Sequence, residues 1–255
     1  MPELLSYQEE GPVLVVRLER PESGNVLSRQ LQGELLSAWE HLESEDRLLA
    51  AVVHGGENVF SVGHDVPELL SAADDPSMAV PVEGMFPHIL SKPVIAAVEG
   101  GCYGLGFELA LACDLRVGSE NTRFKTVFIE RSLSPDSGMS YFLPRIVGAS
   151  RAFDLVFTSR MVDADEAYRI GLLDRMTTTD QLMEDAKALA REIAFWPPVA
   201  MQMSKRVLQH STESSLEEQL LHERRGLIYS RRAPHDVEEA AASFRERRPP
   251  NFTGH

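Results

Sequence analysis

Residues 94–115, VIAAVEGGCYGLGFELALACDL, decide the fold of this chain. The apolar run Val94–Val98 is typical of a buried strand, and a helix-like segment carrying Glu108 in its first turn opens after a glycine-dense bend. Glycines let a backbone approach a ligand closely. A helix N-terminus offers unpaired N–H groups with a partial positive charge. The stretch therefore predicts an enzyme site that holds developing negative charge beside a carboxylate.

The remaining periodicity predicts an α/β fold followed by helices. Apolar runs at Val13–Leu18 and Leu48–His54 are typical of strands, and Leu27–Leu42 repeats apolar residues at helical spacing. Beyond Arg145 the pattern is helical, with Asp163 expected to cap one of the helices. We therefore expect largely parallel sheets with a helical tail.

Composition excludes several classes of protein. A length of 255 residues with 43% apolar residues suits one large domain or slightly more. The net charge of −14 argues against non-specific binding to nucleic acid or to an anionic membrane. The acidic N-terminus does not match a signal peptide, so we expect a cytoplasmic protein in which Cys102 and Cys113 are buried reduced thiols. The eight histidines form no ligand-like cluster, so we expect no metal.

Two further segments carry possible chemistry. Residues 58–68, NVFSVGHDVPE, form either a second bend that exposes backbone N–H groups or a plain strand–turn–helix connection. In residues 131–141, RSLSPDSGMSY, Asp136 lies in a turn between apolar flanks. An aspartate at the edge of an apolar pocket would have its pKa raised by desolvation, which suits a general base. The glycine order at 104–108 does not match a dinucleotide fingerprint, so we expect no nucleotide cofactor.

Taken in order, the motifs resemble the enoyl-CoA hydratase/isomerase (crotonase) family from about Val13 to Phe252. The matching pieces are Asn25-Val26-Leu27, FSVGHD at 60–65, GLGFE at 104–108, Cys113-Asp114, PDSG at 135–138, Leu143-Pro144-Arg145 and FRERRPPNF at 244–252. The resemblance implies a crotonase-like spiral of ββα turns over residues 1–195, which holds an acyl-CoA site. It implies a C-terminal helical region over residues 196–255 that covers coenzyme A and forms homotrimers or homohexamers. The coenzyme A thioester would be the substrate, with no separate cofactor.

The resemblance also implies roles for individual residues. The backbone N–H groups of His64 and Leu105 would form an oxyanion hole for the thioester oxygen. Val62, Asp65 and Phe128 would line the substrate site. At the other end of the chain, Phe244 and Arg247 would contact coenzyme A, for which the planar guanidinium of arginine suits the phosphates.

The acid–base residues leave the reaction open. Family hydratases use two glutamates: Glu108 matches the first, whereas the second falls on Phe128, with Glu130 two residues further on. Some family isomerases place an acid at the position of Asp136. The sequence therefore favours double-bond isomerisation with Asp136 as the proton carrier and Glu108 as a catalytic or positioning group.

Two alternatives remain open at this stage. One is a 2-enoyl-CoA hydratase that uses Glu108 with Glu130 or an ordered water, and the other is an acyl-CoA binder without catalysis. Acyl-chain preference would depend on the Ala72–Ile89 segment.

Overall fold

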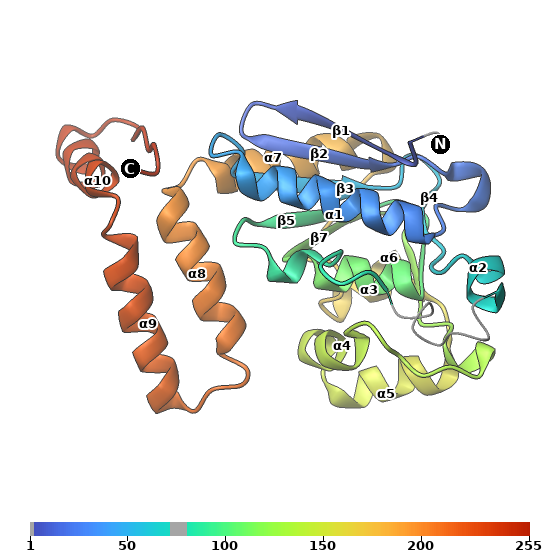
Figure 1. Ribbon diagram of the computed structural model, residues 1–255. Helices are drawn as coiled ribbons and strands as arrows, with labels where there is room; N and C mark the ends of the chain where they lie inside the picture. The colour runs from blue at the N-terminus through green and yellow to red at the C-terminus, as the bar shows by residue number, and fades with distance from the viewer. Residues whose placement is uncertain (1–2, 72–80) are drawn as a thin grey trace.

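The computed structural model describes residues 3–71 and 81–255, so residues 72–80 of the Ala72–Ile89 segment lie outside the described residues. Two sheets form the body of the molecule, with helices around them (Figure 1). The six-stranded sheet has the order β1 (Leu5–Glu10), β2 (Val13–Leu18), β3 (Ala50–His54), β5 (Val94–Val98), β7 (Leu115–Ser119) and β10 (Arg175–Thr177). The four-stranded sheet has the order β4 (Val59–Ser61), β6 (Gly101–Tyr103), β8 (Arg123–Lys125) and β9 (Val162–Asp163).

Successive turns of the chain repeat one pattern, a strand in each sheet followed by a helix. The first turn is β3, β4 and α2 (Val66–Ser71), the second is β5, β6 and α3 (Leu105–Ala112), and the third is β7, β8 and α4 (Met139–Val147). Neighbouring strands of these turns pair in parallel, whereas β1 and β9 pair antiparallel at sheet edges. The expected spiral of ββα turns with largely parallel sheets is confirmed.

Helices on both sides of the six-stranded sheet bury its apolar side chains. Helix α1 (Arg29–Ser44) begins at Ser28, whose hydroxyl accepts from the Leu31 amide at 3.3 Å, and it packs its apolar face into the larger core. Helix α7 (Leu182–Ala194) packs against β2, β3 and β5 through Leu182 and Leu189, forming a second core. Helix α1 lies where the apolar spacing of Leu27–Leu42 predicts it, and α7 lies in the region beyond Arg145 that the pattern predicts to be helical.

Further helices complete the body. They are α5 (Ala149–Thr158) and α6 (Ala164–Arg169), with the 3-10 turns η1 (Pro21–Ser23), η3 (Pro87–Ile89), η4 (Ile129–Arg131) and η5 (Thr179–Gln181). The Asp163 side chain caps α6 by accepting from the Glu166 amide at 2.9 Å, as predicted. Cys102 and Cys113 are free and buried, which confirms the expected reduced thiols.

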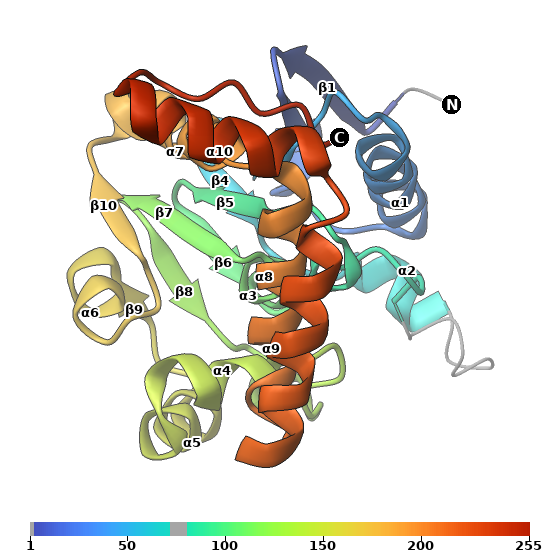
Figure 2. The same ribbon diagram turned by 90° about the vertical axis from the view of Figure 1, so that its left-hand side faces the viewer.

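Three C-terminal helices form an arm beside the body (Figure 1), and this arm faces the viewer in Figure 2. They are α8 (Pro198–His210), α9 (Leu216–Ser230) and α10 (Pro234–Glu246). Lys205 anchors α8 to the body: its buried Nζ donates to the Lys92 carbonyl at 2.9 Å and contacts an Asp114 carboxylate oxygen at 2.8 Å. Among the described residues, no helix is both long enough and apolar enough to cross a bilayer.

Candidate active site

Helix α3 carries Glu108 into the interior, and glycines make this placement possible. Gly104, with φ +50°, precedes the helix in a conformation that side-chain-bearing residues rarely adopt. Gly106 lies so close to β4 that a Cβ added there would come within 2.6 Å of the Ser61 Cβ and carbonyl oxygen. All eight residues of α3 are buried. The glycine-dense bend thus brings the first turn of α3 directly against β4.

The Glu108 carboxyl group is buried with only one oxygen paired. Its Oε1 accepts from the backbone amides of Ser137 at 3.1 Å and Met139 at 3.4 Å, at the start of α4. Its Oε2 is buried and has no hydrogen-bond partner among the described residues. Burial, and then the charge of Asp136, raises the pKa of Glu108 to about 8. Glu108 is therefore largely protonated at neutral pH.

Asp136 lies beside this carboxyl group, but it is exposed. Its Oδ1 accepts from the Ser137 hydroxyl at 3.0 Å, and its charge contributes to the raised pKa of Glu108. The sequence predicts desolvation of Asp136, and this is wrong. The Asp136 side chain is exposed, and the carboxyl group buried beside the turn at 135–138 is that of Glu108. The two carboxyl groups therefore differ sharply in environment, a pattern common to acid–base pairs.

The two bends that are expected to supply N–H donors touch each other. Gly63, with φ +101°, lies so near the start of α3 that an added Cβ would come within 3.2 Å of the Leu105 amide nitrogen. Within residues 3–71 and 81–255, the backbone amides of His64 and Leu105 donate no hydrogen bond. Both amides are thus unpaired within the described part of the chain. Burial lowers the pKa of the His64 imidazole, against the opposing effect of the Asp136 charge.

Neither Phe128, which stands where family hydratases have their second glutamate, nor the nearby Glu130 brings an acid to this site. Phe128 is 3% exposed and belongs to the main core. Glu130 forms an ion pair with Lys125 at 2.6 Å, and its side chain is 42% exposed. The alternative that uses Glu130 with Glu108 therefore lacks structural support. The local backbone is unusual, since Val127 adopts φ +55° and packs near Gly104.

Two other expected substrate residues have different surroundings. Val62 is 37% exposed and lies against Gly24. Asp65 forms an ion pair with Arg20 at 3.3 Å. Val62 therefore has a surface open to a ligand, whereas the Asp65 carboxylate already has a partner.

A groove of about 890 Å³ begins at Asp136 and Ser137. One wall is the 81–89 segment, and the other walls come from α4 and the end of α8. Sequence reasoning missed the groove residues His88, Tyr141 and Phe142. The only signal for them was the proximity of Tyr141 and Phe142 to the Asp136 turn along the chain. His88 comes from a separate segment, and only tertiary packing places it here.

Phe244 and Arg247 lie elsewhere in the single chain. They line a second hollow, of about 710 Å³, together with Trp196 and Phe252. Helix α10 lies apart from α3 in both views of the ribbon (Figures 1 and 2). The structure therefore does not bring these two residues together with Glu108 within one chain.

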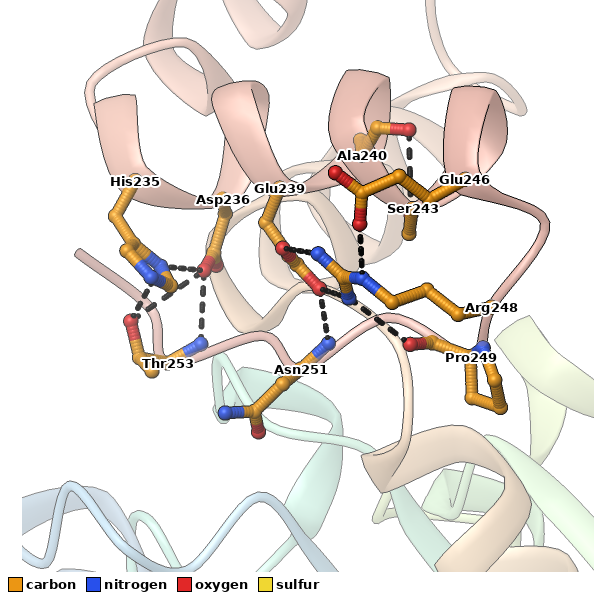
Figure 3. Close-up of polar contacts among 10 residues, drawn as sticks. All are labelled: His235, Asp236, Glu239, Ala240, Ser243, Glu246, Arg248, Pro249, Asn251 and Thr253. Carbon is orange, nitrogen blue, oxygen red and sulfur yellow. Dashed lines mark hydrogen bonds and ion pairs between the residues drawn. The ribbon is translucent and has the colours of Figure 1, made fainter.

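Polar contacts fix the tail that forms this second hollow. Arg248 contacts Glu239 through both terminal nitrogens and Glu246 through Nε at 2.7 Å (Figure 3). The buried Asp236 accepts from the Thr253 amide at 2.8 Å and the Gly254 amide at 2.9 Å. These contacts fold residues 248–254 back along α10.

Groups of three or more His, Cys, Asp or Glu side chains arranged to hold a metal are absent from the described part of the chain. The features described for this site are the unlike carboxyl groups of Glu108 and Asp136, the amides of His64 and Leu105, and the groove.

Comparison with known proteins identifies relatives over nearly the whole length. Residues 8–255 match the family model described as enoyl-CoA hydratase/isomerase. A probable enoyl-CoA hydratase of Mycobacterium leprae is 35% identical over 97% of this chain and 95% of its own length. A 4-chlorobenzoyl coenzyme A dehalogenase of Arthrobacter is 31% identical over 93% of this chain and 89% of its own. The crystal structure of an enoyl-CoA hydratase from Bacillus anthracis superposes with a TM-score of 0.93 at 28% identity, covering 99% of this chain and 100% of the other.

Proposed function

We propose, since this chain belongs to the enoyl-CoA hydratase/isomerase family, that it adds water across the double bond of a 2-enoyl-CoA thioester. The observation that carries this proposal is the pair of unlike carboxyl groups. Glu108 is buried with its pKa raised to about 8, and the exposed Asp136 lies beside it. A protonated acid and a carboxylate base at one site are what the addition of water requires.

In the proposed step, the Asp136 carboxylate takes a proton from a water molecule as the water oxygen bonds to the β-carbon. The electron pair of the double bond moves through the α-carbon onto the thioester oxygen, forming an enolate. Glu108 then gives its proton to the α-carbon and becomes a carboxylate. Proton exchange with solvent returns both groups to their starting states.

We propose the amides of His64 and Leu105 as the donors to the enolate oxygen. The lack of an acceptor for either amide among the described residues and the contact between the two bends support this role. Fixed N–H donors stabilise charge that develops in the transition state, and the loss of one donor costs about 3–4 kcal/mol. The imidazole of His64 has no role in this step.

Isomerisation of a 3-enoyl-CoA, the reaction favoured from the sequence, is the second candidate. The buried Phe128 and the Lys125 ion pair of Glu130 support it, because both leave Asp136 as the second acid–base group. Asp136 would remove a proton from the α-carbon and return it to the γ-carbon. The hydratase names of relatives such as the Mycobacterium leprae protein support hydration as the first candidate.

We also propose that residues 1–195 hold the two carboxyl groups and the two amides, and that residues 196–255, whose α8 closes one wall of the groove, serve assembly and cover coenzyme A. Phe244 and Arg247 would then meet the coenzyme A of a neighbouring copy in a homotrimer or homohexamer. The distance of α10 from α3 and the exposed apolar residues of α9 support this arrangement.

Mass spectrometry in deuterated water tests the reaction. Crotonyl-CoA should gain the mass of one heavy water, and Glu108→Gln or Asp136→Asn should abolish the gain. Glu130→Gln is the matched control and should retain it. Exchange or migration from a 3-enoyl-CoA, without hydration of crotonyl-CoA, would select isomerisation. Binding of thioesters without either change would identify a non-catalytic binder.

A further inference from the structure

We infer that the groove beside Asp136 selects an acyl group that carries an aromatic ring, in preference to a linear alkyl chain of equal carbon number. This inference rests on the proposed function, because it assigns the substrate class of the same site. It depends on the aromatic side chains of the groove and on how firmly they are held.

Aromatic rings follow one another along the groove wall. Phe86 lies 6.4 Å from His88, and His88 lies edge-on to Phe142 at 5.5 Å between ring centroids. Phe142 in turn lies edge-on to Tyr141 at 5.1 Å. The Arg145 guanidinium covers the Tyr141 ring at 3.6 Å from its centroid. Four rings and a planar cation therefore form a continuous series that runs from the 81–89 wall of the groove to the α4 wall.

This series begins next to the acid–base pair. Tyr141 and Phe142 lie in the first turn of α4, and their amides both donate to the Gly138 carbonyl at 2.9 Å. The amide of Ser137, one residue before Gly138, donates to Glu108. A thioester held at Glu108 would thus direct its acyl group along these rings.

The opposite end of the ring series is fixed by contacts from two helices. The Trp39 indole of α1 donates to the Met85 carbonyl at 2.7 Å. The Gln209 amide of α8 donates to the His88 carbonyl at 2.7 Å. Burial lowers the pKa of His88, and this favours a neutral imidazole ring at the groove wall. The backbone that carries Phe86 and His88 is therefore held by α1 and α8 without a ligand, which reduces the ordering cost of binding.

Ring geometry and groove size favour an aromatic acyl group. Aromatic side chains interact best with another ring in offset or edge-on arrangements, beyond the contribution of buried area alone. A linear chain gains only from buried area, which is worth about the same at any apolar wall. The groove volume of about 890 Å³ is near the upper end of ordinary ligand pockets, about 300–1,000 Å³, so a bulky group fits.

The test compares the binding of two unreactive thioesters that have nine acyl carbons each, 3-phenylpropanoyl-CoA and nonanoyl-CoA. Calorimetric titration of the full-length protein gives both dissociation constants. Simple hydrophobicity ranks the linear chain first, because it is the more apolar group. We expect the opposite order, with the phenyl compound binding at least fivefold more tightly.

Variants locate the preference. Tyr141→Leu and Phe142→Leu should each reduce the ratio of the nonanoyl-CoA to the 3-phenylpropanoyl-CoA dissociation constant at least threefold, because each removes a ring that contacts the phenyl group. The ratio separates this loss from a folding defect, which would weaken the binding of both thioesters alike. Phe153→Leu is the control, since Phe153 is exposed and lines a separate hollow beside α5. It should leave the ratio unchanged.

Each outcome has a distinct meaning. Equal or tighter binding of nonanoyl-CoA to the unmodified protein overturns the inference, and so does a preference that survives both groove variants. Binding of neither thioester beyond coenzyme A alone overturns it as well. Failure of the proposed function is separate, since it appears as an absence of any change in crotonyl-CoA or a 3-enoyl-CoA.

Discussion

Helices α3 and α9 differ in how far their apolar residues are buried. Every residue of α3 is buried by the chain itself, including the Glu108 carboxyl group. None of the residues of α9 is buried, and Leu227 and Ile228 are 64% and 67% exposed. The environment of α3 is complete within one chain, so it can shift the pKa of a buried acid. The environment of α9 is left open, as expected if a second copy of the chain completes it.

Introducing charged residues on α9 tests this comparison and should give the largest effect, a loss of assembly. Burial of two such side chains contributes about 3–6 kcal/mol, and a buried charge adds a desolvation cost. The double variant Leu227→Glu/Ile228→Glu should therefore reduce the particle mass, measured by light scattering, to that of one 28.4 kDa chain. Tyr7→Glu, at an exposed tyrosine on β1, should leave the mass unchanged. An unmodified protein that is already monomeric would refute the proposed assembly.

Glu108→Gln tests the catalytic side of the comparison. Removal of a general acid–base group costs about 10²–10⁴ in rate, so kcat for hydration should fall by that factor. Glu130→Gln changes a carboxylate that is held by Lys125 and should alter kcat less than threefold. Equal losses in the two variants would contradict the assignment of Glu108. In the unmodified enzyme, kcat/KM should decline above about pH 8, as Glu108 loses the proton that it donates.

The same substitution should change the pH dependence of stability. The pKa of Glu108 is about 8 when folded and 4.5 by ordinary expectation when unfolded, so the folded state binds more protons between these values. The contribution of Glu108 to stability is therefore fully present below pH 4.5 and is lost as pH rises through 8. At pH 9 the free energy of unfolding of the Glu108→Gln variant should exceed that of the unmodified protein by about 3–5 kcal/mol, since each pKa unit corresponds to about 1.4 kcal/mol. Urea unfolding at pH 5 and pH 9 measures this, and a constant difference between the proteins would contradict the burial cost.

Gly106→Ala should give the smallest of these effects. The new methyl group would lie 2.6 Å from Ser61 atoms, and overpacking of this kind costs about 1–3 kcal/mol. Gly33→Ala is the matched control, because a Cβ on that α1 residue meets nothing within 4 Å. That control should stabilise the protein by about 0.4–1 kcal/mol. Thermal unfolding of both variants decides the matter, and stabilisation by Gly106→Ala would show that α3 does not need close contact with β4.

Much of the fold could be predicted from local pattern. The strand at Val94–Val98, the helix after it and the amphipathic helices α1 and α7 follow from apolar spacing alone. The short strands β6 and β8 were missed, because three residues are too few to show a period, and β4 was only one of two interpretations of residues 58–68. These strands build the second sheet, whose β4 lies against α3.

Local sequence is enough to establish a glycine bend, a following helix and a carboxylate in its first turn, because these features depend on residues close together in the chain. Which carboxylate is desolvated follows from the tertiary structure, because burial depends on packing between distant segments. It buried Glu108 rather than Asp136, paired Glu130 with Lys125 and brought His88 beside Phe142. The pKa of a buried acid and the shape of a groove both depend on neighbouring side chains, and many of those neighbours come from distant parts of the chain.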